Sequence, residues 1–181
     1  MIGGKVSRIL LIGFMGAGKT EVGRALADSL GWCFADFDQV LEQDTGATIA
    51  EIFERDGEVG FRKLEAEVGQ RLLSVQKAVL ASGGGWAAVE GRVSAVPTGT
   101  VTIWLDVSAP EALRRTRAGG LTRPLLVRSD IPERVTELMQ IRAPFYSEAQ
   151  YRVDTEGSTV EDVTARILTI LANHHHKTSA E

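Results

Sequence analysis

The sequence predicts an α/β fold in which helices cover both faces of a parallel sheet. Short apolar runs of strand length alternate with longer segments whose apolar residues recur at helical spacing. The first run, 8–12, is apolar from Ile9 onward and ends at Gly13, as expected for a strand buried on both faces. Because strands and helices alternate regularly, the strands are expected to pair in parallel through helical crossovers.

The expected elements follow one another along the whole chain. Short apolar runs predict strands at 8–12, 32–34, 78–81, 101–105 and 151–153. Helical spacing predicts helices at 21–30, 49–55, 59–75, 110–117, 131–146 and 160–172. Gly31 directly follows the first of these helices, where glycine commonly ends a helix.

One domain is expected, because no repeat, linker or change of composition divides the chain. We assign residues 1–172 to this domain and residues 119–130, which are rich in loop-forming residues, to a mobile lid. Residues 173–181 are predicted to form a flexible tail. Its three adjacent histidines, 174–176, are a metal-binding pattern, but a terminal tail is the favoured interpretation.

Composition and charge exclude several classes of protein. The 181 residues are 44% hydrophobic and 24% charged, as in soluble globular proteins. A net charge of −4 argues against a general binder of nucleic acid or anionic membranes. Cys33 is the only cysteine, which excludes an internal disulfide and suits a reducing cytosol. No apolar run approaches the ~18 residues of a membrane span. A cytoplasmic protein, and a monomer, is expected.

A glycine-rich motif directly follows the first expected strand. Residues 13–20, Gly-Phe-Met-Gly-Ala-Gly-Lys-Thr, match the pattern G-x-x-x-x-G-K-[ST] and precede an expected helix. Glycines there allow backbone N–H groups to surround phosphate oxygens at the positive end of the helix. Lys19 would reach the β- and γ-phosphates, and the Thr20 hydroxyl would bind Mg²⁺. In this context the motif predicts a nucleoside triphosphate site rather than an incidental glycine-rich turn.

The motif alone does not say what is done with the nucleotide. A guanine-specific switch normally carries N-K-x-D, whereas Asn173 is the only asparagine in this chain. Many ATPases place an acidic residue at the end of a further strand, but the run 78–81 is followed by Ser82. The GTPase hypothesis is therefore disfavoured, and the acid that serves the metal must come from elsewhere.

Two carboxylates that follow the second expected strand are the candidates for the acid that holds the metal. Asp36 and Asp38 are two residues apart, so on an extended segment both side chains point to one face. One would hold Mg²⁺ through water, and the other would bind or deprotonate a hydroxyl group. Capping of the helix that follows is an equally favoured role for Asp38.

Arginines and a second glycine run indicate an anionic acceptor. Arg62 and Arg142 lie on expected helices and suit bidentate capture of a carboxylate, although a surface charge is the common alternative. The triplet 83–85 follows a strand and allows a ligand to approach the backbone, unless it is a simple tight turn. Arg123 lies in the expected lid, where it would bring positive charge to the transferred phosphate.

Together these motifs resemble one family, shikimate kinase. From about residue 8 to 171, the order of motifs is that of the family. They are residues 13–20, Phe34-Ala35-Asp36-Phe37-Asp38, Gly57-Glu58 with Phe61-Arg62, Gly83-Gly84-Gly85, Arg123-Pro124-Leu125-Leu126 and Arg142-Ala143-Pro144-Phe145-Tyr146. The resemblance implies a P-loop kinase fold of the nucleoside-monophosphate-kinase type, with three α/β/α layers around a five-stranded parallel sheet. It also implies transfer of the ATP γ-phosphoryl group to the 3-hydroxyl of shikimate, a step toward aromatic amino acids.

The resemblance also implies residue roles. The catalytic residues would be Lys19, Asp38 and Arg123. The nucleotide would be bound by Gly16, Ala17, Gly18, Lys19, Thr20, Glu21, Arg115 and Arg123. Shikimate would be bound by Asp38, Arg62, Gly83, Gly84, Gly85 and Arg142, the two arginines clamping its carboxylate. Mg²⁺ would be held by Thr20 directly and by Asp36 through water.

Three positions depart from the family pattern. Glu21 stands where many members have threonine, outside the phosphate contacts. Trp86 follows the glycine triplet where a small residue is more usual, so an altered floor of the acid pocket is expected. Residues 156–158 lack an arginine that some members place beside adenine, which gives Arg115 more of the nucleotide contact. The alternative functions are a gluconate- or nucleotide-type kinase and a non-catalytic nucleotide-binding regulator.

Overall fold

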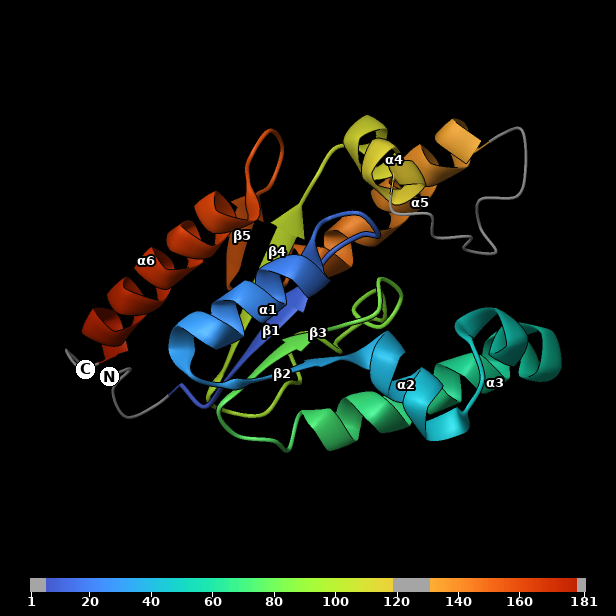
Figure 1. Ribbon diagram of the computed structural model, residues 1–181, viewed down its shortest axis with the longest axis horizontal. Helices are drawn as coiled ribbons and strands as arrows, with labels where there is room; N and C mark the ends of the chain where they lie inside the picture. The colour runs from blue at the N-terminus through green and yellow to red at the C-terminus, as the bar shows by residue number, and fades with distance from the viewer. Residues whose placement is uncertain (1–5, 119–130, 179–181) are drawn as a thin grey trace.

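A five-stranded, fully parallel sheet forms the centre of the molecule (Figure 1). The computed structural model describes residues 6–118 and 131–178. The strand order is β2-β3-β1-β4-β5, so the first strand lies in the middle. The α/β class and the five-stranded parallel sheet predicted from the sequence are confirmed. The expected lid and Arg123 lie outside the described residues.

All elements lie close to their predicted positions except the helix at Phe37–Thr45, which none of the predicted helix ranges covers. The strands are β1 (Arg8–Ile12), β2 (Cys33–Asp36), β3 (Ala78–Ala81), β4 (Thr100–Asp106) and β5 (Tyr151–Asp154). The helices are α1 (Lys19–Leu30), α2 (Phe37–Thr45), α3 (Ile49–Leu72), α4 (Ala109–Ala118), α5 (Ile131–Tyr146) and α6 (Val160–Thr178).

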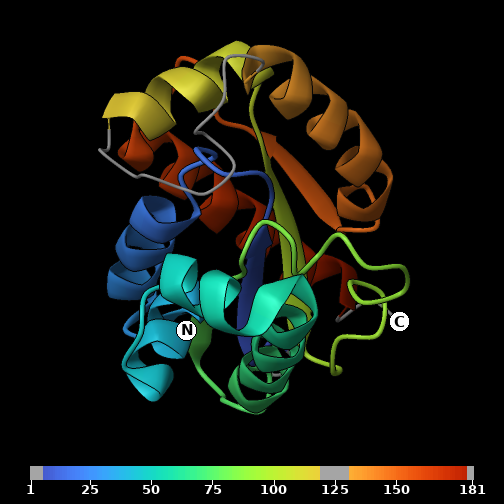
Figure 2. The same ribbon diagram turned by 90° about the vertical axis from the view of Figure 1, so that its right-hand side faces the viewer.

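Helices pack on both faces of the sheet. Figure 1 shows α1 in front of the sheet, with α6 beside it, and α5 behind; Figure 2 shows the same arrangement from the side. Every residue of β1 and β3 is buried, because both strands have neighbours on each side and helices on each face. No helix among the described residues is long and apolar enough to cross a bilayer.

The helices expected at 49–55 and 59–75 correspond to the two halves of α3, which meet at a kink at Gly57, whose φ is 68° and ψ −176°; the second half ends at Leu72 rather than at residue 75. One helix prediction was wrong in its bounds. The last helix does not end at residue 172 but extends to Thr178. Within this extension, His174 Nδ1 lies 2.7 Å from the Tyr151 hydroxyl and the histidine ring packs edge-on against that of Tyr151.

The strand order determines where the predicted site residues meet. In a parallel sheet the carboxyl ends of all strands lie at one edge, and ligands bind where neighbouring crossovers diverge. Here β1 leads into the phosphate loop, β2 ends at Asp36, and β3, which lies between them, leads into Ser82 and the glycine triplet. Segments far apart in the sequence are thereby gathered at one edge of the sheet.

Candidate active site

The phosphate loop connects β1 to the first turn of α1. Gly18 caps the helix with a left-handed backbone, φ 88°, which a residue with a side chain rarely adopts. The Lys19 ammonium group donates hydrogen bonds to the carbonyls of Gly13 and Phe14, at 2.9 and 2.8 Å. The lysine therefore folds back over the loop at the N-terminal end of α1.

Thr20 and Asp36 are joined across the site. The Thr20 hydroxyl donates to Asp36 Oδ2 at 2.6 Å. The other oxygen, Oδ1, accepts from the backbone N–H groups of Asp38 and Gln39 at 3.0 and 3.4 Å, and so caps α2. The capping role considered for Asp38 thus belongs to Asp36, because the helix begins at Phe37, two residues earlier than a cap at Asp38 would require. Asp38 lies in the first turn of α2, with its carboxylate directed toward the glycine triplet.

The glycine triplet touches a different charged group at each position. A Cβ atom on Gly83 would lie 2.6 Å from Glu65 Oε1 and 2.8 Å from Asp38 Oδ1. One on Gly84 would lie 3.6 Å from an Arg142 nitrogen, and one on Gly85 would overlap the guanidinium group of Arg62. At Gly83 and Gly85 the space that a side chain would need is filled by charged groups from α2 and α3, and Arg142 of α5 lies beside Gly84.

Glu65 is a site residue that the sequence analysis missed. Its side chain is buried and forms a 2.8 Å ion pair with Arg62, which lies one helical turn earlier on α3. Burial raises the pKa of Glu65 above its ordinary value of 4.5, Arg62 lowers it, and the nearby Asp38 raises it further. The i, i+3 spacing of Arg62 and Glu65 was the available signal, but such pairs are usually surface contacts.

Arg142 lies on the last turns of α5, against the phosphate loop. Its guanidinium carbon lies 5.6 Å from the centre of the Phe14 ring. Four residues later, Tyr146 is buried and donates a 2.5 Å hydrogen bond to the carbonyl of Gly84. Burial raises the pKa of the Tyr146 hydroxyl above 10.0, with Arg142 acting in the opposite direction. Tyr146, to which the sequence analysis assigned no role, therefore connects α5 to the glycine triplet through this hydrogen bond.

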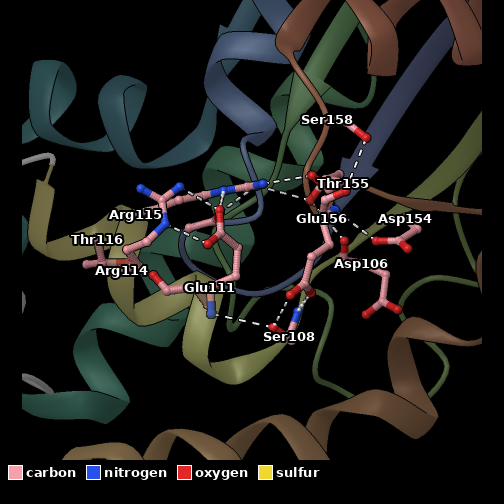
Figure 3. A network of polar contacts seen from close by, with 12 residues as sticks. Asp106, Ser108, Glu111, Arg114, Arg115, Thr116, Asp154, Thr155, Glu156 and Ser158 are labelled. Atoms are coloured by element: carbon pink, nitrogen blue, oxygen red, sulfur yellow. Dashed lines mark hydrogen bonds and ion pairs between the residues drawn. The ribbon is translucent and has the colours of Figure 1, made fainter.

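Arg115 belongs to a polar network at the far end of the site (Figure 3). Its guanidinium group donates to Glu111 at 2.7 Å, to the carbonyl of Thr155 at 2.7 Å and to the carbonyl of Gly16 at 3.3 Å. The pKa of Glu111 falls to about 2, because Arg114 and Arg115 donate to its carboxylate. Arg115 is thus held between α4, the loop after β5 and the phosphate loop.

A cavity of about 670 Å³ brings most of the predicted nucleotide and metal residues together. Its lining includes Gly16, Gly18, Lys19, Thr20, Glu21, Asp36, Asp38, Ser82, Gly84 and Arg115. A second cavity of about 280 Å³ is lined in part by Arg142, Phe14 and Met15, and Met15 lines both cavities. Ala17 is buried beneath the loop.

Trp86 lies in the core directly after the glycine triplet. Its side chain is buried, its ring lies edge-on to Phe37 at 5.4 Å, and its indole nitrogen points at Gly69 of α3. The Arg92 guanidinium carbon lies 5.4 Å from the same ring. The indole is accommodated in the core by a glycine on α3, and the expectation of an altered pocket floor stays a prediction.

The residues present fit a magnesium ion that arrives with a nucleotide. No three His, Cys, Asp or Glu side chains in the described ranges lie together as a metal site. Mg²⁺ seldom needs such a group, since one or two protein oxygens, phosphates and water complete its octahedral shell. The hydroxyl of Thr20 and the carboxylate of Asp36, joined at 2.6 Å beside the phosphate loop, are donors of the right kind.

Comparisons with known proteins agree with this geometry. The family model for shikimate kinase matches residues 15–172. A shikimate kinase of Synechococcus sp. (strain RCC307) is 43% identical over 162 residues, covering 90% of this chain and 83% of that protein. The solved shikimate kinase from Acinetobacter baumannii in complex with shikimate has a TM-score of 0.87 and 38% identity, covering 93% of this chain and 94% of that one.

A gluconate-type kinase, the alternative considered above, shares only its fold with this chain. A gluconokinase from Sinorhizobium meliloti is 18% identical, with a TM-score of 0.62 over 96% of this chain and 95% of that one. Identity of this size supports common architecture and no common acceptor. The family model covers most of the chain, and the Synechococcus protein is well above 30% identical along nearly all of it. This chain belongs to the shikimate kinase family and is an ATP-dependent phosphotransferase of that family.

Proposed function

We propose that this enzyme transfers the γ-phosphoryl group of ATP to the 3-hydroxyl of shikimate, and that the residues described above carry the reaction. The observation that best supports this is the glycine triplet, because it lies against Asp38, Arg62 and Arg142 at three successive positions. A carboxylate next to two guanidinium groups suits an acceptor that has both hydroxyl groups and a carboxylate.

On the nucleotide side, the backbone N–H groups of the phosphate loop and the Lys19 ammonium group would bind the phosphates. Lys19 already faces the loop interior, where it bonds the carbonyls of Gly13 and Phe14. Phosphate oxygens would replace those carbonyls as acceptors, so positive charge is in place before the nucleotide arrives. Arg115, held by Glu111 and Thr155, would lie beside the base.

On the acceptor side, the carboxylate of Asp38 would accept a hydrogen bond from the reacting hydroxyl and hold it in line with the γ-phosphorus. Arg62 and Arg142 would pair with the acceptor carboxylate and so determine its orientation. Glu65, which is buried and bonded to Arg62, would fix the direction of that guanidinium group. Arg123 keeps its predicted role as a lid cation.

The Mg²⁺ ion would be held by the Thr20 hydroxyl and, through water, by Asp36. When bound, it would neutralise charge on the β- and γ-phosphates. The second carboxylate oxygen of Asp36 would still accept hydrogen bonds from the first N–H groups of α2. The residue that holds the metal through water therefore also determines the position of Asp38. We place the enzyme in the cytoplasm, acting as a monomer on small molecules.

The test is an assay of ADP release with different acceptors. We expect turnover with shikimate, and a kcat/KM at least a hundredfold lower with gluconate and with nucleoside monophosphates. Quinate shares the carboxylate and hydroxyl groups of shikimate, so its kcat/KM should be intermediate. Phosphorus NMR of the product should show a monoester on the 3-hydroxyl. Strong turnover of gluconate or of a monophosphate, with none of shikimate, would contradict the proposal. Binding of nucleotide without turnover of any acceptor would favour the regulator alternative.

A further inference from the structure

Ser82 has a buried hydroxyl group without a partner. The residue follows β3, is 2% exposed, and its Oγ makes no hydrogen bond within the described part of the chain. Buried hydroxyl groups are nearly always bonded, because an unmet hydrogen bond costs stability relative to an apolar side chain. A partner that arrives with a ligand would explain why a serine is placed there.

The place of Ser82 indicates which ligand. Strand β3 lies between β2, which ends at Asp36, and β1, which leads into the phosphate loop. Asp36 is paired with Ala81, so Ser82 is the next residue along, and its backbone N–H donates to the carbonyl of Leu11 at 3.0 Å. Ser82 also lines the 670 Å³ cavity together with Lys19 and Thr20, so the residue borders the space where nucleotide and metal are assigned.

Asp36 has little acceptor capacity left for water around the metal. Its Oδ1 accepts from two backbone N–H groups and its Oδ2 accepts from Thr20. Water bound to a divalent cation is a strong hydrogen-bond donor and needs acceptors. A serine hydroxyl has two lone pairs and one rotatable proton, so it can accept from such a water and still donate.

We propose that the Ser82 hydroxyl binds a water molecule in the hydration shell of the nucleotide-bound Mg²⁺. A neutral hydroxyl thus stands where many P-loop ATPases place a strand-end acid. The inference rests on the proposed placement of the metal at Thr20 and Asp36. Beyond that placement, it assigns to the Ser82 hydroxyl, at the end of β3, a contact with a water molecule bound to the Mg²⁺ ion.

The first test compares ADP binding with and without Mg²⁺ in wild type and Ser82→Ala by calorimetry. We expect Ser82→Ala to weaken binding of Mg·ADP roughly fivefold to tenfold, the size of one hydrogen bond to a charged complex. The affinity for ADP in excess EDTA, and for shikimate alone, should change less than twofold. An equal loss with and without Mg²⁺ would mean that the hydroxyl binds phosphate, and a loss of shikimate affinity would mean that it binds the acceptor. Either result, or no change at all, overturns the proposal.

The same experiment separates this inference from the placement of the metal. If wild type binds ADP no more tightly with Mg²⁺ than without it, the metal site at Thr20 and Asp36 is wrong. If wild type shows the magnesium effect and Ser82→Ala keeps it in full, only the role of Ser82 is wrong.

A second measurement excludes a structural role for the hydroxyl. Without ligands, Ser82→Ala should melt at the same temperature as wild type or higher, because the alanine leaves no unmet hydrogen bond. The matched control is Thr102→Val on β4, far along the sheet from the loops. The Thr102 hydroxyl is equally buried, but it accepts a 2.9 Å hydrogen bond from the Gln150 N–H, so its loss should lower the melting temperature. A drop for Ser82→Ala as large as that for Thr102→Val would contradict the proposal.

Discussion

The carboxylate of Asp38 lies against Gly83, beside the buried carboxylate of Glu65. If Asp38 holds the acceptor hydroxyl, Asp38→Asn should lower kcat by roughly 10²- to 10⁴-fold, the usual contribution of a positioned acid or base. The melting temperature should stay close to that of wild type, because Asp36, not Asp38, caps α2. Steady-state kinetics and thermal melts test this. Near-normal turnover in a folded variant would rule out the role.

The proposed partner of Arg142 is the acceptor rather than the nucleotide. Arg142→Ala should raise the KM for shikimate by roughly 10- to 100-fold, as expected for a lost hydrogen bond between charged groups. The KM for ATP should change less than threefold. Arg152→Ala is a suitable control, since Arg152 is a largely exposed cation paired with Asp106 on the edge of the sheet. Equal increases in both KM values would contradict capture of the carboxylate by Arg142.

Glu65 makes the stability of the protein depend on pH. Because burial raises its pKa, the folded state binds the proton more tightly than the unfolded state does. The free energy of unfolding should therefore fall as pH rises above 4.5 and through the raised pKa. In Glu65→Gln this part of the pH dependence should be lost. Urea unfolding of both proteins at pH 5 and pH 8 measures the difference, and parallel pH profiles would show that Glu65 does not titrate in this range.

At the scale of elements, the kink in α3 determines where Arg62 and Glu65 lie. Gly57 combines φ 68° with ψ −176°, a backbone region open almost only to glycine. The first half of α3 is capped by Thr48 and Glu51, and the half after the kink carries the two charged residues toward the glycine triplet. The bend therefore links a single backbone conformation to the geometry of the acceptor site.

Gly57→Ala should destabilise the protein by roughly 2–3 kcal/mol and raise the KM for shikimate. Gly46→Ala is a matched control: both glycines have positive φ and open space around a new Cβ, but Gly46 has ψ 17°, an ordinary left-handed conformation. Its cost should be about 1 kcal/mol, without an effect on KM. Urea unfolding and kinetics measure both. An equal cost for the two substitutions would mean that α3 straightens without strain.

For the molecule as a whole, the exposed apolar surface predicts a monomer. In the ranges the structure describes, the exposed large hydrophobic residues are Val59, Val75, Val89 and Ile141. They come from α3, the turn after it, the segment after β3 and α5, so they do not share one element or one stretch of sequence. Sedimentation equilibrium should give a mass near 19.6 kDa at micromolar concentration. A mass of twice that value would indicate a dimer.

The sequence predicted the sheet well, because buried strands are continuous apolar runs bounded by glycine. It was least accurate at β2, an edge strand whose residues are only partly buried, so that its apolar signal is weak. The kink in α3 looked like a gap between helices, since glycine both breaks and bends helical patterns. The phosphate loop could be predicted because its chemistry is local. Glu65, Tyr146 and Ser82 could not be, because their roles depend on contacts with the distant glycine triplet and phosphate loop.

The net charge of −4 describes the whole surface and not the cleft. Lys19 and Arg115 line one cavity at the carboxyl edge of the sheet, Arg142 lines a second that shares Met15 with it, and Arg62 lies beside Gly85. Cations are thus gathered at one place on an acidic molecule. Attraction of anionic substrates should act within the cleft and be weakened little by salt, since these groups are partly buried.

The glycine triplet offers separate controls of the proposed acceptor site. A methyl group at position 83 would push on Asp38 and Glu65, and one at position 85 on Arg62, whereas one at position 84 would make an ordinary contact with Arg142 at 3.6 Å. Alanine at 83 and alanine at 85 would therefore disturb the proposed base and one half of the proposed carboxylate clamp in turn, without removing any charged group, and alanine at 84 is their matched control. The shape of this pocket depends on missing side chains, so its selectivity for the acceptor can be altered by adding single carbon atoms.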